Sequence, residues 1–207
     1  MQGSSHIRLG KWIGAEYGMT GRKLAAFIWG NIEPDLAVPS HLGHAEGIEG
    51  RLEGHGYPAA AKKAVRLYRK LENGCRTAED YFLLGKLCHY LADSFTWAHN
   101  PDYPGTLSAH ISYERQMDRV MMDGVMPVHF PEIEAQSFPE AFASLHAVYE
   151  TISPSIVRDL SFIMAAAEFG CRKVLEKESA RGTRRRALQK TLAAAVSLPV
   201  SGHLTGV

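Results

Sequence analysis

The helical character of the chain is clearest in one long stretch, Thr77–His99, which reads TAEDYFLLGKLCHYLADSFTWAH. Asp80 follows Thr77 by three positions, a spacing that favours the start of a helix because each side chain can accept a backbone N–H from the other residue. No position in the stretch carries proline, and the apolar residues recur at helical spacing. We therefore predict a helix from Thr77 to about Ala98.

The remaining sequence shows the same helical periodicity, and no segment alternates apolar and polar residues as a half-buried strand would. Pro34 forbids simple continuation of the helix predicted over residues 21–31. Gly182 and Thr183 begin a separate last helix. We predict an all-α fold in which residues 1–207 form a single domain, a multi-helix bundle. Another predicted helix begins after Ser5. The remaining predicted helices cover residues 21–31, 58–71, 107–123, 137–149, 153–176 and 182–198.

The composition is typical of a globular protein with a sizeable core. The chain has 207 residues, 45% of them hydrophobic and 22% charged. Its formal charge of +1 favours neither a nucleic-acid nor a membrane partner. The ten histidines are the unusual count, because histidine is the commonest metal ligand in proteins.

The cysteines and the N-terminal segment bear on the compartment. Cys75, Cys88 and Cys171 form no CxxC pair and no even set, so we expect no disulfide framework and a reducing environment. The segment MQGSSHIRLGKWIG lacks the long apolar core of a signal peptide. No stretch reaches the roughly 18 apolar residues that span a bilayer. We expect a soluble, cytoplasmic protein.

The first candidate metal ligands lie on the predicted helix that begins at Thr77. His89 and Asp93 are four residues apart, so their side chains leave from one helix face, one turn apart. Gly85, one turn earlier on the same stripe, leaves room for a bulky site. His99 follows near the predicted end of the helix, where the chain can turn a ligand back.

A second pair repeats the same spacing. His110 and Glu114 stand four residues apart in HISYERQMD, on another predicted helix. Buried clusters of histidines and carboxylates are costly unless a metal or specific hydrogen bonds satisfy them. The sequence therefore predicts a metal site. The mixture of nitrogen and carboxylate ligands suits zinc, with manganese and iron as alternatives.

These motifs together resemble the zinc-dependent phospholipase C family, whose fold is shared by single-strand-specific zinc nucleases. The run H-x3-D-x5-H followed by H-x3-E carries the resemblance. Ser5-His6-Ile7 resembles the early histidine ligand of the family, and GNIEPD at 30–35 resembles its Gly-x-x-x-Pro-Asp turn. A further histidine is expected ahead of the next helix; His55 is best placed, with His41 and His44 as rivals. The resemblance covers roughly residues 5–120.

The resemblance implies how the ligands are shared among metal ions. One zinc ion would be held by His55, His89 and Asp93, and a second by His99, His110 and Glu114. A third would use His6 and a bridging Asp93, together with an N-terminal tryptophan that the phospholipases provide. No tryptophan precedes His6 in this chain, so we predict two zinc ions and leave the third open. Asp35 would lie at the catalytic water.

The resemblance also implies an enzyme, a zinc-dependent hydrolase of phosphodiester bonds that acts through metal-activated water. We expect a small phosphodiester or a phospholipid head group as substrate and no stable nucleic-acid partner; the oligomeric state stays open. One alternative is a nuclease-like phosphodiesterase, and another is a non-catalytic helical bundle with a structural metal. A phosphohydrolase of the HD type would need an adjacent His-Asp pair, which the sequence lacks.

Overall fold

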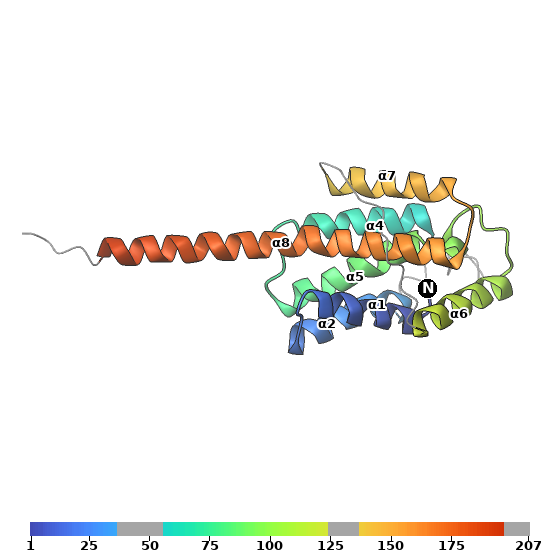
Figure 1. Ribbon diagram of the computed structural model, residues 1–207, viewed down its shortest axis with the longest axis horizontal. Helices are drawn as coiled ribbons and strands as arrows, with labels where there is room; N and C mark the ends of the chain where they lie inside the picture. Colours follow the sequence, from blue (N-terminus) through green and yellow to red (C-terminus); the bar gives the residue numbers. More distant parts are fainter. Residues whose placement is uncertain (37–55, 124–136, 197–207) are drawn as a thin grey trace, which may run out of the picture.

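The computed structural model describes the backbone of residues 1–36, 56–123 and 137–196, and the side chains of these segments up to residue 177. All regular elements in these segments are helices, which confirms the predicted all-α fold (Figure 1). They are α1 (Gly3–Glu16), α2 (Gly21–Leu36), α4 (Tyr57–Lys70), α5 (Ala78–Ser94), the short 3₁₀ turn η2 (Trp97–His99), α6 (Leu107–Met122), α7 (Phe138–Thr151) and α8 (Ile156–Val196).

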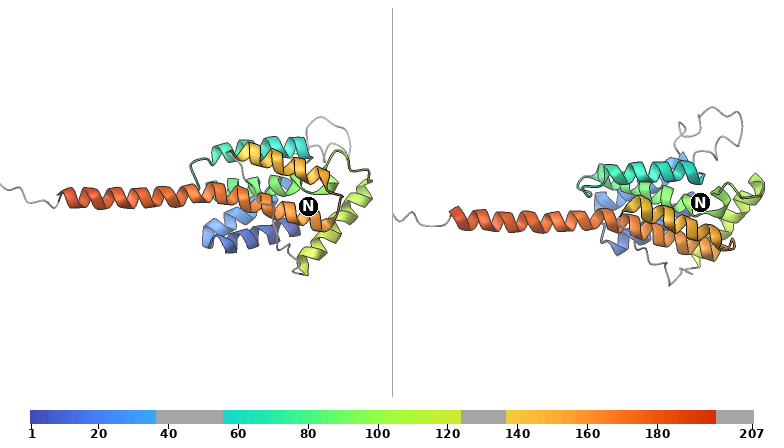
Figure 2. Two further views of the ribbon diagram at one scale, coloured as in Figure 1. Left: turned by 45° about the horizontal axis from the view of Figure 1, so that its top comes forward. Right: turned by 90° about the horizontal axis from the view of Figure 1, so that it is seen from above.

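Helix α5 lies at the centre of the bundle, in contact with α1, α2, α4 and α8 (Figures 1 and 2). Its apolar side chains Leu84, Leu87 and Leu91 are buried in the core. Because neighbours surround α5, its polar residues His89 and Asp93 are also fully buried. The core thus places the predicted ligand pair in the interior, where solvent does not compete for it.

The start of α5 agrees with the prediction, but its end comes earlier. Thr77 and Asp80 form a complete capping box. The helix ends at Ser94 rather than near Ala98. The hydroxyls of Ser94 and Thr96 donate to backbone carbonyls four residues earlier, which provides local alternatives to continued helix. The chain then turns into η2, which carries His99.

Helix α2 extends further than predicted, because it continues through Pro34 to Leu36. Proline removes one backbone hydrogen bond and crowds the carbonyl four residues earlier. Pro34 lies in the last turn of α2, so only the end of the helix is affected. The prediction of a turn at GNIEPD was therefore wrong, and Asp35 is a residue of α2.

Two glycines bring α2 and α5 into close contact. A methyl group at Gly30 would overlap the backbone oxygen of Phe82, and one at Gly85 would overlap that of Phe27. The expected free space beside Gly85 is therefore occupied by the backbone of α2. This close packing holds Asp35 on α2 beside the ligand face of α5.

Helix α8 is a single element where two helices were predicted. It continues through Gly182, because one glycine inside a helix costs only about 1 kcal/mol relative to alanine. Figure 1 shows its C-terminal part extending past the other helices. Cys75, Cys88 and Cys171 are buried free thiols, in agreement with the absence of a disulfide framework. No helix in the described segments is long and apolar enough to span a membrane.

Candidate metal centre

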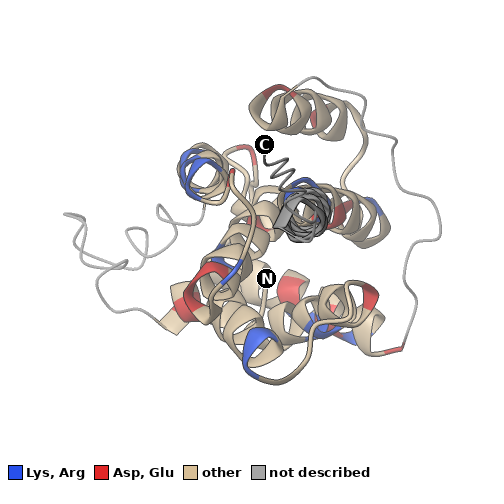
Figure 3. Cartoon of the chain, turned by 90° about the vertical axis from the view of Figure 1, so that its left-hand side faces the viewer, with Lys and Arg blue, Asp and Glu red and all other residues tan. Residues whose placement is uncertain are grey.

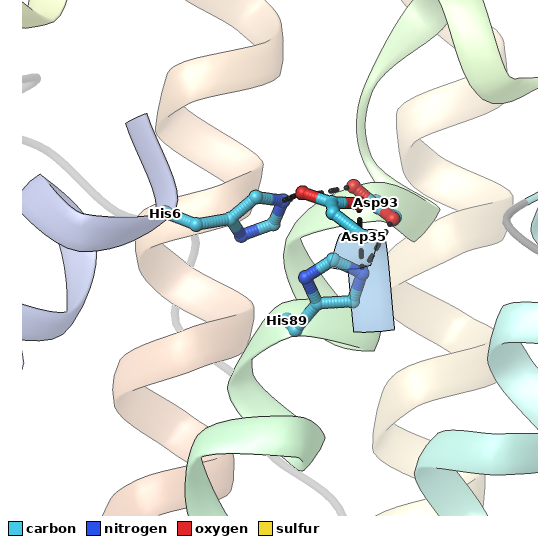
Figure 4. A group of neighbouring side chains, drawn as sticks. All are labelled: His6, Asp35, His89 and Asp93. Atoms are coloured by element: carbon cyan, nitrogen blue, oxygen red, sulfur yellow. Dashed lines mark ion pairs between the residues drawn. The ribbon is translucent and has the colours of Figure 1, made fainter. Parts of the chain in front are cut away.

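A first group of potential ligands gathers where α1, α2 and α5 meet. His6 comes from α1, Asp35 from α2, and His89 with Asp93 from α5 (Figure 4). One ligand atom from each residue lies within 4.8 Å of the others. The two carboxylate oxygens of Asp93 face different histidines, Oδ1 at 3.3 Å from His6 Nε2 and Oδ2 at 3.1 Å from His89 Nε2.

Asp35 differs from the rest of this group in its exposure. Its side chain is 29% exposed, whereas those of His6, His89 and Asp93 are fully buried. Asp35 Oδ1 lies 3.7 Å from His89 Nε2, and Oδ2 lies 4.0 Å from His6 Nε2. The carboxylate therefore borders the ligand group on the side open to solvent.

The hydrogen bonding of the two histidines suits a cation. The backbone oxygen of Asn31 lies 3.0 Å from His89 Nδ1 and accepts its proton. The neutral ring then has its lone pair on Nε2, which faces carboxylates instead of donors. His6 stacks on His89 with 4.1 Å between ring centroids. Neither ring nitrogen of His6 has a hydrogen-bond partner in the described segments. A bound metal would take one nitrogen of each ring as a ligand and offset the carboxylate charge.

A second group lies beside the first and uses η2 and α6. His99, His110 and Glu114 place one ligand atom each within 4.8 Å of one another. Glu114 Oε1 lies 2.9 Å from His99 Nε2 and 3.1 Å from His110 Nε2. Asp93 Oδ1 lies 3.7 Å from His99 Nδ1. Asp93 thus borders both groups.

The α-amino group of Met1 lies between the two groups. It donates to Asp93 Oδ1 at 3.0 Å, and it lies 3.1 Å from Glu114 Oε1 and 3.3 Å from His99 Nε2. Burial lowers the pKa of this amine, but the nearby carboxylates outweigh that effect and raise it to about 11. The amine therefore lies among Asp93, Glu114 and His99, at the junction of the two groups.

Burial and neighbouring charges shift the pKa values of these groups in opposite directions. Burial and the charge of His89 lower the pKa of His6 to about 4. Burial also opposes protonation of His89, but the Asp93 carboxylate outweighs it and raises the pKa. The pKa of Glu114 falls despite burial, because the Met1 amine, His110 and His99 stabilise the carboxylate. The carboxylates, the histidines and the Met1 amine of this cluster therefore affect one another's protonation.

The remaining predicted ligand falls outside the part of the chain that the structure describes. His55 and its rivals His41 and His44 all belong to residues 37–55. The other predicted site residues, seven in number, fall into the two groups described above.

A buried polar network behind η2 was not predicted. Asp159 on α8 is fully buried, and its Oδ2 accepts the backbone N–H of Trp97 at 2.6 Å and the hydroxyl of Tyr113 at 2.8 Å. Trp97 begins the turn that carries His99, and Tyr113 precedes Glu114 on α6. Asp159 therefore fixes the backbone next to two ligands of the second group.

Arg158 and Tyr149 complete this network on the other side of Asp159. Asp159 Oδ1 accepts from Arg158 Nη2 at 2.7 Å and from the Tyr149 hydroxyl at 2.9 Å. The guanidinium lies 3.9 Å from the Tyr149 ring centroid. A buried carboxylate with a paired cation and several donors is a rigid support. An isolated Arg-Asp dipeptide in the sequence gives no sign of this role.

A pocket of about 450 Å³ opens beside the second group. His99 and His110 form part of its wall, so a molecule inside it would reach the ligand face of that group. The other lining residues are uncharged: Gly56, Pro58, Ala59, Ala98, Asn100, Pro101, Tyr103, Gly105, Thr106 and Leu107.

The fold and the site together define an all-helical bundle with two adjacent His/carboxylate groups that could hold metal. Within that class the family is clear: the family model described as zinc dependent phospholipase C matches residues 5–169, and the chain belongs to this family. The match extends beyond residue 120, where the predicted resemblance ended, and includes Arg158 and Asp159. Membership in this family indicates a zinc-dependent hydrolase.

Comparisons with curated proteins and with solved structures found no match.

Proposed function

We propose that this protein hydrolyses phosphodiester bonds with metal-activated water, as a phospholipase C-like enzyme. The observation that carries the proposal is the position of Asp35, a partly exposed carboxylate at the edge of a buried ligand group. A purely structural metal site has no need for a carboxylate on its solvent side. His6, His89 and Asp93 would hold metal in the first group, and His99, His110 and Glu114 in the second.

Bound zinc ions would lower the pKa of water to about 7 and neutralise charge on the phosphate oxygens. Asp35 would orient the attacking water and accept its proton, because its carboxylate lies on the exposed side of the group. Asn31 holds the ring of His89 in one orientation through its backbone oxygen. Asp159 does the equivalent for the turn that carries His99.

The neighbouring pocket would receive the part of the substrate attached to the phosphate. Its wall combines two ligand histidines with uncharged side chains such as Tyr103 and Leu107. Such a lining suits an uncharged, mainly apolar group. This supports a lipid-like phosphodiester over a highly charged polymer.

The test compares Asp35→Asn with the unchanged protein in assays on p-nitrophenyl phosphorylcholine and bis-p-nitrophenyl phosphate. We expect kcat to fall by about a hundredfold or more, as for loss of a general base, while the zinc content per chain stays the same. Asp102→Asn changes an exposed carboxylate outside both ligand groups; it serves as the control and should keep full activity.

Three other outcomes separate the alternatives. Hydrolysis of bis-p-nitrophenyl phosphate without any action on the phosphorylcholine ester would favour a nuclease-like phosphodiesterase. Bound zinc with no hydrolysis of either ester would favour a structural metal site. If zinc remains bound and turnover is unchanged in Asp35→Asn, Asp35 is not the base.

A further inference from the structure

A second concave feature, between α4 and α5, is lined mainly by basic side chains. Its volume is about 310 Å³. The chemistry of its wall differs from that of the pocket beside His99, because it contains four cationic groups and, among the described residues, no carboxylate. The lining residues are Lys63, Arg66, Leu67, Lys70, Leu83, Lys86 and Tyr90.

The positive charge belongs to a helix that is basic along its exposed side. Helix α4 carries five basic residues and no acidic one, and Figure 3 shows it at the upper left with blue bands and no red ones. Across the pocket, Lys86 Nζ lies 2.6 Å from Glu33 Oε2. Among the described residues, four cations line this pocket, which we call the α4–α5 pocket, and Glu33 lies at its edge.

Lys63 is the cation whose surroundings favour an anion most. Its side chain is half-buried, and its ammonium group lies 4.9 Å from the centre of the Tyr90 ring. Burial lowers its pKa, and the charge of Lys86 acts in the same direction, while Asp93 opposes both. An ammonium group that has lost part of its hydration gains more from an added anion than one in bulk water.

The α4–α5 pocket involves residues that are close in sequence to the first ligand group. Tyr90 follows His89 directly on α5, and Glu33 precedes Asp35 by two residues on α2. The pocket contains none of the potential ligands of the candidate metal centre.

We propose that the α4–α5 pocket binds a phosphate-bearing anion. The guanidinium of Arg66 offers paired donors that match phosphate oxygens, and the three lysines supply point charges around it. The volume is at the lower end for small-molecule sites, which suits a phosphate or a phosphorylated head group. The ligand is either a free phosphorylated molecule or the head group of an anionic lipid. This binding does not depend on the proposed hydrolysis.

The test is calorimetric titration of the zinc-loaded full chain with inorganic phosphate, in three forms of the protein. The pocket variant combines Lys63→Gln with Lys86→Gln. The matched control combines Lys62→Gln with Arg69→Gln, which remove the same charge but line the neighbouring groove between α4 and α7. All three forms share any phosphate binding at the zinc ions, so that binding does not distinguish one form from another.

We expect the pocket variant to weaken the additional phosphate site by about tenfold or more and the control by less than about threefold. The charge-conserving pair Lys63→Arg with Lys86→Arg should keep the site. Equal weakening in the pocket variant and the control would overturn the proposal, because it would indicate general attraction to a basic surface. So would an unchanged affinity in the pocket variant, or a loss in the arginine pair at normal zinc content.

Vesicles identify the source of the phosphate. The chain is sedimented with phosphatidylcholine vesicles, with and without phosphatidic acid. If phosphatidic acid promotes binding that the pocket variant loses and the control keeps, the ligand is a lipid head group. If inorganic phosphate binds at the pocket but vesicles do not, the ligand is a soluble phosphorylated molecule. If neither probe distinguishes the pocket variant from the control, the proposal fails.

Discussion

A single residue, Asp93, connects the two ligand groups. Its Oδ1 atom lies 3.3 Å from His6 Nε2 and 3.7 Å from His99 Nδ1, while Oδ2 faces His89. A fully buried carboxylate is costly in the interior unless positive charge compensates it. The Met1 amine supplies part of that charge at 3.0 Å. A metal ion held by either group would supply further positive charge beside Asp93.

His146 is a buried histidine outside the metal centre, and it makes stability depend on pH. Its Nε2 donates to Asn100 Oδ1 at 3.2 Å, and its ring stacks on Tyr57. Burial lowers its pKa to about 4; a bond to the Ser94 backbone opposes the shift, and the charge of Arg158 adds to it. The nearby Glu150 is exposed to solvent and does not reverse the shift.

The consequence is a loss of stability on acidification. The histidine of the unfolded chain has a pKa of about 6.5, so between pH 6.5 and 4 the unfolded state takes up a proton that folded His146 refuses. We expect about 2 kcal/mol of the free energy of unfolding to be lost from this source between pH 7 and 5. His146→Gln should remove this part of the pH dependence, measured by urea unfolding at both pH values. If the free energy of unfolding depends on pH identically in the unchanged protein and in His146→Gln, His146 is not the source of this loss.

At the scale of helices, the crossing of α2 and α5 places Asp35 beside His89. The crossing depends on Gly30 and Gly85, where a methyl group would overlap the backbone of the opposite helix. We expect Gly85→Ala to lower the free energy of unfolding by about 2 kcal/mol or more, because the helices must separate. Chemical unfolding followed by circular dichroism measures this change.

Gly3→Ala is the matched control for that variant. A methyl group at Gly3 meets nothing within 4 Å, so its effect should stay within about 0.5 kcal/mol. If Gly85→Ala is as mild as Gly3→Ala, the close contact between α2 and α5 does not hold the site together.

The network around Asp159 connects α8 and α6 to the turn η2. In Asp159→Asn, the new amide nitrogen cannot accept the N–H of Trp97 or the hydroxyl of Tyr113, and the charge opposite Arg158 is lost. Removal of a carboxylate that supports metal ligands typically weakens metal affinity by about tenfold to a hundredfold. We expect zinc at the second group to be weakened in this way, with zinc at the first group retained.

Competition with a zinc-selective chelator measures the two affinities separately. Asp102→Asn, which changes an exposed carboxylate, should leave both affinities unchanged. Equal weakening of both zinc sites in Asp159→Asn would indicate a general loss of stability instead of a specific support of His99.

Local signals in the sequence were sufficient for much of this arrangement. The cap at Thr77 was predicted because it depends on residues within one turn. The pairs His89–Asp93 and His110–Glu114 were found for the same reason, since a helix places residues four apart on one face. These short-range rules gave the helical class and most of the candidate site.

The rest depends on contacts between distant segments. Asp159 is 62 residues away from Trp97 in the chain, and the Met1 amine reaches Asp93 across 92 residues. No spacing rule connects such pairs. The continuation of α2 through Pro34 likewise depends on its position in the last turn and on packing against α5, and propensity alone predicts a break.

For the whole molecule, the bundle brings five separate elements to one centre. Helices α1, α2, α5 and α6, together with η2, each contribute at least one potential ligand. The family match over residues 5–169 includes the potential ligands from all of these elements. Because the ligands come from distant parts of the chain, metal binding and the fold should stabilise each other.

The multinuclear metal centre is tested most directly by the zinc content of the full chain. The purified protein is reconstituted with zinc, and the bound zinc is measured by plasma mass spectrometry. Two ligand groups predict at least two zinc ions per chain. Asp93→Asn should lower that number, because Asp93 borders both groups. Less than one zinc ion per chain in the unchanged, folded protein would contradict the multinuclear metal centre.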